Sequence, residues 1–271
     1  MTPATSEPQT PLLAVRGLGK QFEARDGRKS ESWVLRDLSM AVVDGEFVTL
    51  VGPSGAGKST LLNMIAQVDT PSAGEIMLRG QTLATGEHNK LNPGWNRQIG
   101  YVTQDDNLLP WRTLIDNVLF PFEVYGGVDA AAREKAEALM NAVGLTGFEH
   151  YHPHELSGGM RKRAALIRTL VYDPPVILMD EPFGAVDAQT RLQLQNDLLS
   201  LWRLGRKTIV FVTHDIGEAI ALGDRVLVLS RAPAKIIGEH PIKIPRPRKI
   251  EDVFSLPEFP TLYATIRAQV G

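Results

Sequence analysis

The stretch FVTLV-GPSGAGKST-LLNMIA, residues 47–66, decides the fold of this chain. FVTLV is the kind of apolar, β-branched run that forms a buried strand, and LLNMIA has helical spacing. Between them, GPSGAGKST matches the P-loop pattern G-x-x-x-x-G-K-[ST] in the strand-to-helix context that the pattern requires. The alternative is a glycine-rich turn without a ligand. The sequence predicts a phosphate-binding loop made of Gly52, Pro53, Ser54, Gly55, Ala56, Gly57, Lys58, Ser59 and Thr60.

The residue types in this loop suit a nucleoside triphosphate. Backbone N–H groups around Gly55 to Lys58 would surround the phosphates, and the Lys58 ammonium would reach the β and γ oxygens. The Ser59 hydroxyl would be a ligand of Mg²⁺, which prefers oxygen donors. The loop therefore predicts two bound groups, the nucleotide and Mg²⁺.

The composition is that of an ordinary globular protein, with 43% hydrophobic and 22% charged residues among 271. A formal net charge of −2 offers no electrostatic basis for binding nucleic acid, so we expect no nucleic-acid partner. The absence of cysteine excludes disulfides, thiolate zinc sites and cysteine nucleophiles. No apolar run approaches the roughly 18 residues that cross a bilayer. Any membrane role is therefore expected to depend on a partner.

The remaining sequence predicts an α/β core with a helical insertion. VILMD (176–180) and TIVFVT (208–213) are apolar runs of strand length, typical of strands buried on both faces of a parallel sheet. Residues 104–170 read as mainly helical: Thr113 and Asp116 begin one helix, Pro121 is expected to break or kink it, and Gly144 ends the next helix. We expect a flexible tail at 1–11, one main domain at 12–245 and a short C-terminal tail at 246–271.

Polar residues follow three of the predicted strands. Asp180 and Glu181 end the strand VILMD, His214 follows TIVFVT, and Gln104 follows QIGYVT. In open α/β sheets, ligands bind at the carboxyl ends of the strands. Asp180 suits the magnesium shell and Glu181 suits polarising an attacking water, while Gln104 could bond either. A histidine in the position of His214 is more often a capping or loop residue.

The segment LSGGM (156–160) precedes a basic helical stretch, RKRAALIRTL. Ser157, Gly158 and Gly159 open this predicted helix, where unpaired N–H groups and the helix dipole favour an anion. The chain would then hold a second phosphate-binding segment about a hundred residues after the P-loop.

Taken together, the P-loop, Gln104, LSGG, Asp180-Glu181 and His214 resemble the ATP-binding cassette (ABC) ATPases in order and spacing, over about residues 12–245. The resemblance implies an α/β fold: a P-loop ATPase core with a mostly parallel sheet, an N-terminal antiparallel β subdomain and an inserted helical subdomain at about 104–170. It also implies a head-to-tail dimer of two copies that holds two ATP molecules at its interface.

In that family the signature serine and glycines contact the ATP held by the other subunit, so the resemblance gives Ser157, Gly158 and Gly159 a role in trans. Asp187 in GAVDAQ matches the D-loop aspartate, which connects the two sites. Phe22 in KQFEA matches the aromatic residue that stacks on adenine. Trp33, which follows the polar insertion EARDGRKSES, is the alternative if Phe22 is only a core residue. Catalysis would fall to Glu181, His214 and Gln104, with Ser59, Gln104 and Asp180 around Mg²⁺.

Several segments resemble one group within the family, the importer ATPases for nitrate, sulfonate, taurine and bicarbonate. These segments are DDNLLPWRTLIDNVLF, FGAVDAQTR, THDIGEAI, the methionine of LSGGM and a short tail rich in proline and arginine. The resemblance implies an ATPase on the cytoplasmic side of the inner membrane, bound to transmembrane permease subunits and, through them, to a solute-binding protein. The alternatives are the ATPase of an exporter or lipid-trafficking complex, and a soluble ABC protein outside transport.

Residues 107–125 would receive a helix of the permease in such an importer. The aromatic residues here are Trp111, Phe120, Phe122 and Tyr125. The other interpretation is that they fill the interior of the helical subdomain, and both can hold for different faces.

Overall fold

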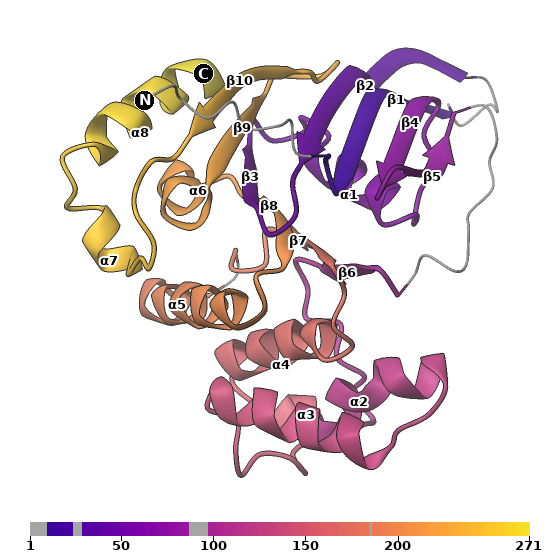
Figure 1. Cartoon of the computed structure of the whole chain (residues 1–271), viewed down its shortest axis with the longest axis vertical. Helices are drawn as coiled ribbons and strands as arrows, with labels where there is room; N and C mark the ends of the chain where they lie inside the picture. The colour runs from indigo at the N-terminus through magenta and orange to yellow at the C-terminus, as the bar shows by residue number, and fades with distance from the viewer. Residues whose placement is uncertain (1–9, 24–28, 87–96, 185) are drawn as a thin grey trace, which may run out of the picture.

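The computed structural model of the chain describes residues 10–23, 29–86, 97–184 and 186–271, and its centre is a six-stranded sheet of order β10-β9-β3-β8-β7-β6 (Figure 1). The strands are β3 (Phe47–Val51), β6 (Ile99–Val102), β7 (Val176–Asp180), β8 (Thr208–Val212), β9 (Arg225–Leu229) and β10 (Ile236–Pro241). All pair in parallel except β10, which is antiparallel to β9. Strands β7 and β8 cover the two apolar runs that the sequence predicts as strands.

Both faces of this sheet are buried, as continuous apolar strands require. In β7, Ile177 and Met179 belong to one hydrophobic cluster, while Val176 and Leu178 belong to another. The other strands alternate in the same way because successive side chains of a strand point to opposite faces. The sheet therefore separates two cores, and its carboxyl-end edge is where polar residues can meet a ligand.

One core lies beneath a second, antiparallel sheet of order β2-β1-β4-β5 (Figure 1). Its strands are β1 (Leu13–Glu23), β2 (Lys29–Val42), β4 (Ala73–Leu78) and β5 (Gln81–Thr85). Helix α1 (Lys58–Ile65) follows the P-loop and buries its apolar residues in the same cluster. Most of the predicted N-terminal tail, residues 1–9, lies outside the described residues.

The middle of the chain forms a helical lobe beyond β6 (Figure 1). It contains α2 (Leu114–Tyr125), α3 (Ala130–Ala142), the 3-10 helix η2 (Pro153–Glu155) and α4 (Gly158–Leu170). Thr113 caps α2 as its pattern predicts, and Gly144 follows α3 with a φ of 68° that favours glycine.

The expected break at Pro121 does not occur, because α2 continues through this residue to Tyr125. Proline removes one backbone hydrogen bond from a helix, but tertiary packing supplies most helical stability in proteins. Here Leu114, Val118 and Leu119 are buried in the core of the lobe, and α2 packs closely on α4. This packing outweighs the local cost of the proline.

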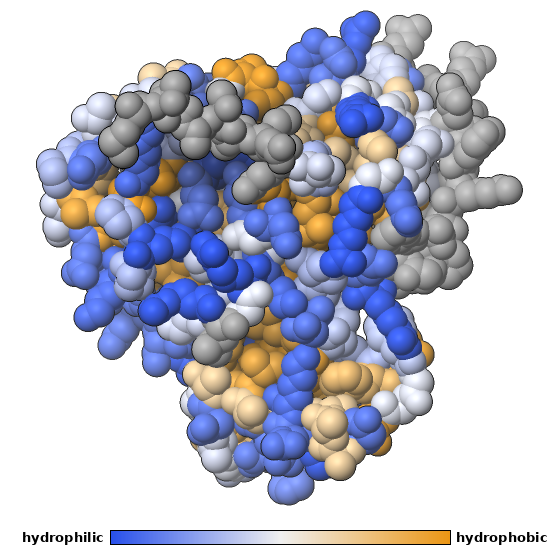
Figure 2. All heavy atoms as spheres, viewed as in Figure 1, coloured by the Kyte–Doolittle hydropathy of each residue, from blue (hydrophilic) through white to orange (hydrophobic). Residues whose placement is uncertain are grey.

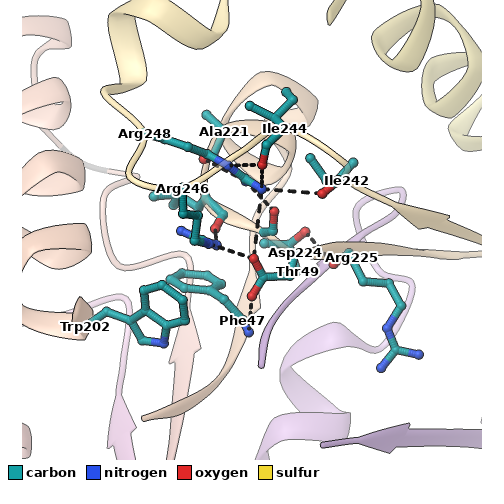
Figure 3. A network of polar contacts seen from close by, with 12 residues as sticks. Phe47, Thr49, Trp202, Ala221, Asp224, Arg225, Ile242, Ile244, Arg246 and Arg248 are labelled. Atoms are coloured by element: carbon teal, nitrogen blue, oxygen red, sulfur yellow. Dashed lines mark hydrogen bonds and ion pairs between the residues drawn. The ribbon is translucent and has the colours of Figure 1, made fainter. Parts of the chain in front are cut away.

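The C-terminal residues, which the sequence indicates only as a short tail, contain two helices that pack on the core. The helices of this half are α5 (Ala188–Gly205), α6 (Ile216–Leu222), α7 (Ile250–Val253) and α8 (Phe259–Val270). Two arginines anchor the segment before α7 (Figure 3). Arg246 pairs with Asp224 at 2.7 Å and stacks 4.2 Å above the Trp202 ring. Arg248 is buried and donates to the Gly223 carbonyl at 2.6 Å and to the Ile244 carbonyl at 2.7 Å.

Replacing Arg248 with Met is expected to destabilise the fold by about 3 kcal/mol, since several buried carbonyls would lose their donor. Burial, with Arg246 nearby, lowers the pKa of Arg248 to about 10, because the guanidinium is removed from water. Chemical unfolding measures the loss. The control is Arg267→Met, which changes an exposed arginine of α8. Equal stability of the two variants would contradict the anchoring role of Arg248.

Hydrophilic side chains cover most of the face in Figure 2, and apolar ones reach it in separate patches, one of them over the helical lobe. Within the described ranges, none of the helices combines the length and the apolar character needed to cross a membrane.

Candidate active site

The carboxyl ends of β3, β7 and β8 converge on one edge of the sheet. The P-loop leaves β3 at Val51, and the Glu181 amide donates to the Val212 carbonyl at 3.0 Å. The Thr213 amide in turn donates to the Leu50 carbonyl at 3.1 Å. These bonds bring the P-loop, Asp180-Glu181 and His214 together, as the position of each motif after a strand predicts.

A pocket of about 440 Å³ opens on this edge, a volume in the range of about 300–1,000 Å³ that is common for ligand pockets. The lining residues are Phe22, Val34, Ser54, Gly55, Ala56, Gly57, Lys58, Ser59, Thr60 and Glu181. Gly57 caps α1 with a φ of 80°, and a β-carbon there would lie 2.9 Å from Val34 and Leu35. The tight approach of loop to strand therefore requires glycine at this position. Hollows of about 530 and 560 Å³ along the C-terminal segment contain none of the predicted site residues.

Lys58 lines the pocket, and Asp180 lies close to it beside Ser59. The Lys58 ammonium donates to the carbonyls of Gly52 at 2.9 Å and Pro53 at 3.0 Å, and burial lowers the pKa of Lys58. Burial raises the pKa of Asp180, while hydrogen bonds with Ser59 and Tyr101 act in the opposite direction. The Ser59 hydroxyl and the Asp180 carboxylate are therefore neighbours, although 121 positions separate them in the sequence.

The donor atoms near Asp180 fit Mg²⁺. Ser59 and Asp180 offer a hydroxyl and a carboxylate oxygen, the hard oxygen ligands that this ion prefers. Gln104 lies further along the edge: a β-carbon added at Gly184 would be 3.9 Å from Gln104 Nε2 and 4.0 Å from Glu181 Oε2. The Gln104 amide and the Glu181 carboxylate thus flank the same glycine.

Glu181 and His214 are in direct contact, with 3.0 Å between Glu181 Oε2 and His214 Nδ1. Glu181 has a φ of 43°, a left-handed conformation that residues other than glycine rarely adopt. Such a strained backbone persists only where the surrounding fold holds it in place, and it is typical of functional positions. The contact favours the catalytic interpretation of His214 over that of a simple loop residue.

Ser157 is the N-cap of α4, and its hydroxyl accepts from the Met160 amide at 3.3 Å. Asp187 is the N-cap of α5 and accepts from the Thr190 amide at 2.9 Å. Thr190 also lies beneath Gly159, where a β-carbon would be 2.7 Å from its methyl group. The structure brings Ser157 to Gly159 and Asp187 together around Thr190, but none of them lines the P-loop pocket of the same chain.

The basic side chains of α4 bind the segment after β6. Arg161 pairs with Asp106 at 3.1 Å, Lys162 donates to the Gln104 carbonyl, and Arg168 donates to the Asn107 carbonyl at 2.7 Å. Three of the basic side chains in the helix that follows LSGGM thus make contacts within the chain. One of these contacts joins the Gln104 carbonyl to α4.

Phe22 and Trp33 have different surroundings. Phe22 lines the P-loop pocket, is 47% exposed and carries the Lys20 ammonium 5.1 Å from its ring centre. Trp33 instead packs on Gly19, where a β-carbon would lie 2.6 Å from its ring. The position of Phe22 is the one that suits a stacked base.

Sequence reasoning missed Tyr101, whose hydroxyl bonds to Asp180 and to Asn63 of α1 at 2.9 Å. Tyr101 belongs to β6, and Val102 of that strand pairs with Met179, just before Asp180. The signal that could have found it is its place three residues before Gln104 at the same sheet edge.

Comparison with known proteins identifies the family of this chain. The family model described as ABC transporter matches residues 35–184, more than half of the chain. An uncharacterized ABC transporter ATP-binding protein of Methanocaldococcus jannaschii is 44% identical over 236 residues, 87% of this chain and 84% of that protein. The taurine import ATP-binding protein TauB of Yersinia pestis is 41% identical over 226 residues, covering 83% and 82% of the two chains.

Two further matches extend the comparison. The aliphatic sulfonates import ATP-binding protein SsuB of Bacillus cereus is 38% identical over 236 residues, 87% of this chain and 88% of that protein. A solved dimeric, post-hydrolysis structure of the ATP-binding cassette MJ0796, bound to ADP and Pi, superposes with a TM-score of 0.71 at 30% identity. That alignment covers 86% of this chain and 99% of the other.

The fold and the pocket define a P-loop ATPase with an antiparallel β sheet and a helical lobe, which confirms the fold class expected from the sequence. The chain belongs to the ABC transporter family of ATP-binding proteins, as its resemblance to the ABC ATPases predicts, and it is an ATPase.

Proposed function

We propose that this chain is the ATP-hydrolysing subunit of an importer for a small solute such as taurine, a sulfonate or nitrate. The observation that carries the proposal is the match with the taurine and aliphatic sulfonates import proteins, which extends over more than 80% of both chains in each case. The chain would lie on the cytoplasmic side of the inner membrane, bound to permease subunits and served by a solute-binding protein.

The ATPase roles proposed for the site follow from its contacts. The P-loop amides and Lys58 bind the phosphates, and Phe22 stacks on the base. Ser59, Gln104 and Asp180 hold Mg²⁺, which supplies charge neutralisation at the β- and γ-phosphates. Glu181 orients and polarises the attacking water. His214 holds the Glu181 carboxylate through the 3.0 Å contact and faces the γ-phosphate.

The signature residues act on a nucleotide bound by a second copy of the chain. In one protomer Ser157 to Gly159 lie at the start of α4, outside the pocket that the P-loop lines. A head-to-tail dimer would bring this helix start to the partner's P-loop, where its N–H groups can bind the γ-phosphate. Hydrolysis then cleaves the γ-phosphate from the nucleotide that bridges the two copies, and their separation drives transport.

The helical lobe offers a surface for the permease. A hollow of about 370 Å³ is lined by residues of 101–125 and of 168–172, among them Leu109, Phe120 and Val124. Trp111, near this hollow in sequence, is 71% exposed, and Val124 is 59% exposed. Phe122, in contrast, packs against the core of the lobe. Trp111 is therefore the aromatic residue most suited to a partner, and Phe122 the one most suited to filling the lobe.

Replacing Trp111 with Ala is expected to leave the ATPase rate of the isolated subunit within about twofold of wild type, since an exposed side chain contributes little to the fold. Transport by the assembled complex should fall about tenfold or more, because tryptophans that become buried in an interface often supply much of its binding energy. Ile237→Ala, which truncates a half-exposed residue of β10, is the control. Equal losses of ATPase activity and transport would favour a core role for Trp111.

The import proposal is tested by reconstituting the chain with its permease and solute-binding protein in vesicles. We expect ATP-dependent uptake of one of taurine, alkanesulfonate, nitrate or bicarbonate that requires the binding protein. ATP-dependent movement in the opposite direction would indicate an exporter or lipid-trafficking complex. Failure to bind any permease would indicate an ABC ATPase outside transport.

A further inference from the structure

A buried carboxyl group, Glu218 of α6, lies behind the active site; it belongs to the segment THDIGEAI, but no sequence motif assigns it a role of its own. The residue is 7% exposed. Gln195 of α5 donates its side-chain amide to Glu218 Oε1 at 2.8 Å, and the Thr213 hydroxyl forms a second hydrogen bond with the carboxyl group. Burial raises the pKa of Glu218. A polar group in such a position is costly unless its partners are held in place.

Arg191 connects this carboxyl group to the loop that follows Glu181. Arg191 and Gln195 are four residues apart on α5, so they share one helix face. The Arg191 guanidinium donates to the carbonyls of Phe183 at 3.3 Å and Val186 at 3.2 Å, and its charge acts on Glu218. These two carbonyls belong to the turn between Glu181 and Asp187.

Thr213 connects the same carboxyl group to His214. Thr213 directly follows the last residue of β8, and its hydroxyl also accepts from the Asp215 amide at 3.0 Å. His214 lies between these two residues and contacts Glu181 at 3.0 Å. Glu218 is therefore bonded to Thr213, which precedes His214, and it interacts electrostatically with Arg191, which binds the loop between Glu181 and Asp187.

We propose that Glu218 is a positioning residue for ATP hydrolysis, which holds the His214 segment and the loop before Asp187 in register with Glu181. The proposal rests on the catalytic roles proposed above for Glu181 and His214. Glu218 has no part in binding the nucleotide, because the pocket is lined by the P-loop side of the site. Its loss affects turnover rather than substrate binding.

The main test is a double variant that carries both Gln195→Leu and Glu218→Leu, compared with the single variant Glu218→Leu. Removing one partner leaves a buried polar group unsatisfied, whereas replacing both restores an apolar contact and much of the stability. We expect the double variant to unfold near the wild-type temperature, keep KM within about twofold and lose about tenfold or more in kcat. A return of kcat to the wild-type value together with stability would overturn the proposal, since it would make the role structural only.

Glu218→Gln is the second variant, because it preserves the shape of the side chain. The amide keeps an acceptor for Gln195 but cannot satisfy both Thr213 and the Arg191 charge as a carboxylate does. We expect a folded protein with KM unchanged and kcat lowered about fivefold. Wild-type kcat in this variant would overturn the proposal by itself.

Two controls separate this proposal from the roles on which it depends. Asp197→Leu breaks a half-buried ion pair of the same helix, with Arg163 at 2.9 Å, without touching the loop before Asp187. It is expected to reduce stability and leave kcat within about twofold. Glu181→Gln, assayed in parallel, tests the catalytic residue itself. Normal turnover by Glu181→Gln would contradict the proposed mechanism. Normal turnover by the Glu218 variants, with turnover lost in Glu181→Gln, would contradict only the positioning role of Glu218.

Discussion

Replacing Glu181 with Gln is expected to lower kcat for ATP hydrolysis by about a hundredfold or more, since the loss of a general base usually costs about 10²–10⁴ in rate. The amide cannot accept a proton from the attacking water, although it retains the size of the carboxylate. The P-loop and Lys58 are unchanged, so ATP binding should persist. A protein that binds ATP but does not hydrolyse it should accumulate as an ATP-dependent dimer, because the nucleotide that bridges the two copies remains intact.

Steady-state hydrolysis and size-exclusion chromatography with and without ATP measure the two halves of this expectation. Glu134→Gln, a change at an exposed position of α3, is the matched control and should behave as wild type in both assays. Normal turnover by Glu181→Gln would show that another group activates the water. Loss of turnover without an ATP-dependent dimer would contradict the bridging role of the nucleotide.

The geometry around Glu181 could be predicted in outline from the sequence, because it follows from the positions at which the parallel strands end. Mainly apolar strands of five residues end at Val51, Asp180 and Val212, and the carboxyl ends of parallel strands share one edge of a sheet. No knowledge of side-chain contacts is needed for that inference. The glycines of the P-loop follow in the same way from the pattern in which they occur.

The supporting contacts could not be predicted, because they depend on packing between segments far apart in the chain. Tyr101 reaches Asp180 only because β6 lies beside β7, and Gln195 of α5 bonds to Glu218 of α6, 23 residues further along the chain. Helix α2 continues through Pro121 for a similar reason, since burial against α4 outweighs a local preference. The anchoring of residues 242–250 by Arg248 also depends on carbonyls that no sequence pattern reveals.

The segment LSGGM also changes meaning once the structure is considered. In the sequence it reads as a second anion site, and the structure adds that Gly159 lies beside Thr190, whose amide binds Asp187, rather than in the P-loop pocket. The start of α4 and the P-loop pocket lie on different parts of one protomer. In a symmetric dimer, the start of α4 from each copy can complete the P-loop pocket of the other copy.

Mixing two inactive variants is expected to restore hydrolysis if the sites are shared in this way. Ser157→Arg should place a bulky cation at the start of α4, and Lys58→Ala should remove the phosphate-binding ammonium, so either variant alone is expected to lose about a hundredfold or more in rate. In a mixed dimer, one site joins the intact P-loop of the first chain to the intact signature of the second. The recovered rate should be roughly a quarter of wild type, because about half of randomly paired dimers are mixed and each has one complete site of two.

The control is a mixture of Lys58→Ala with a chain that carries both substitutions, and this mixture should recover no hydrolysis. The test mixture is measured both by its hydrolysis rate and by the one ATP held per mixed dimer. Absence of recovery in the test mixture would contradict action in trans. Recovery would mean that Ser157 and Lys58 act on the same nucleotide from different copies of the chain, so that the catalytic unit of this ATPase is the dimer.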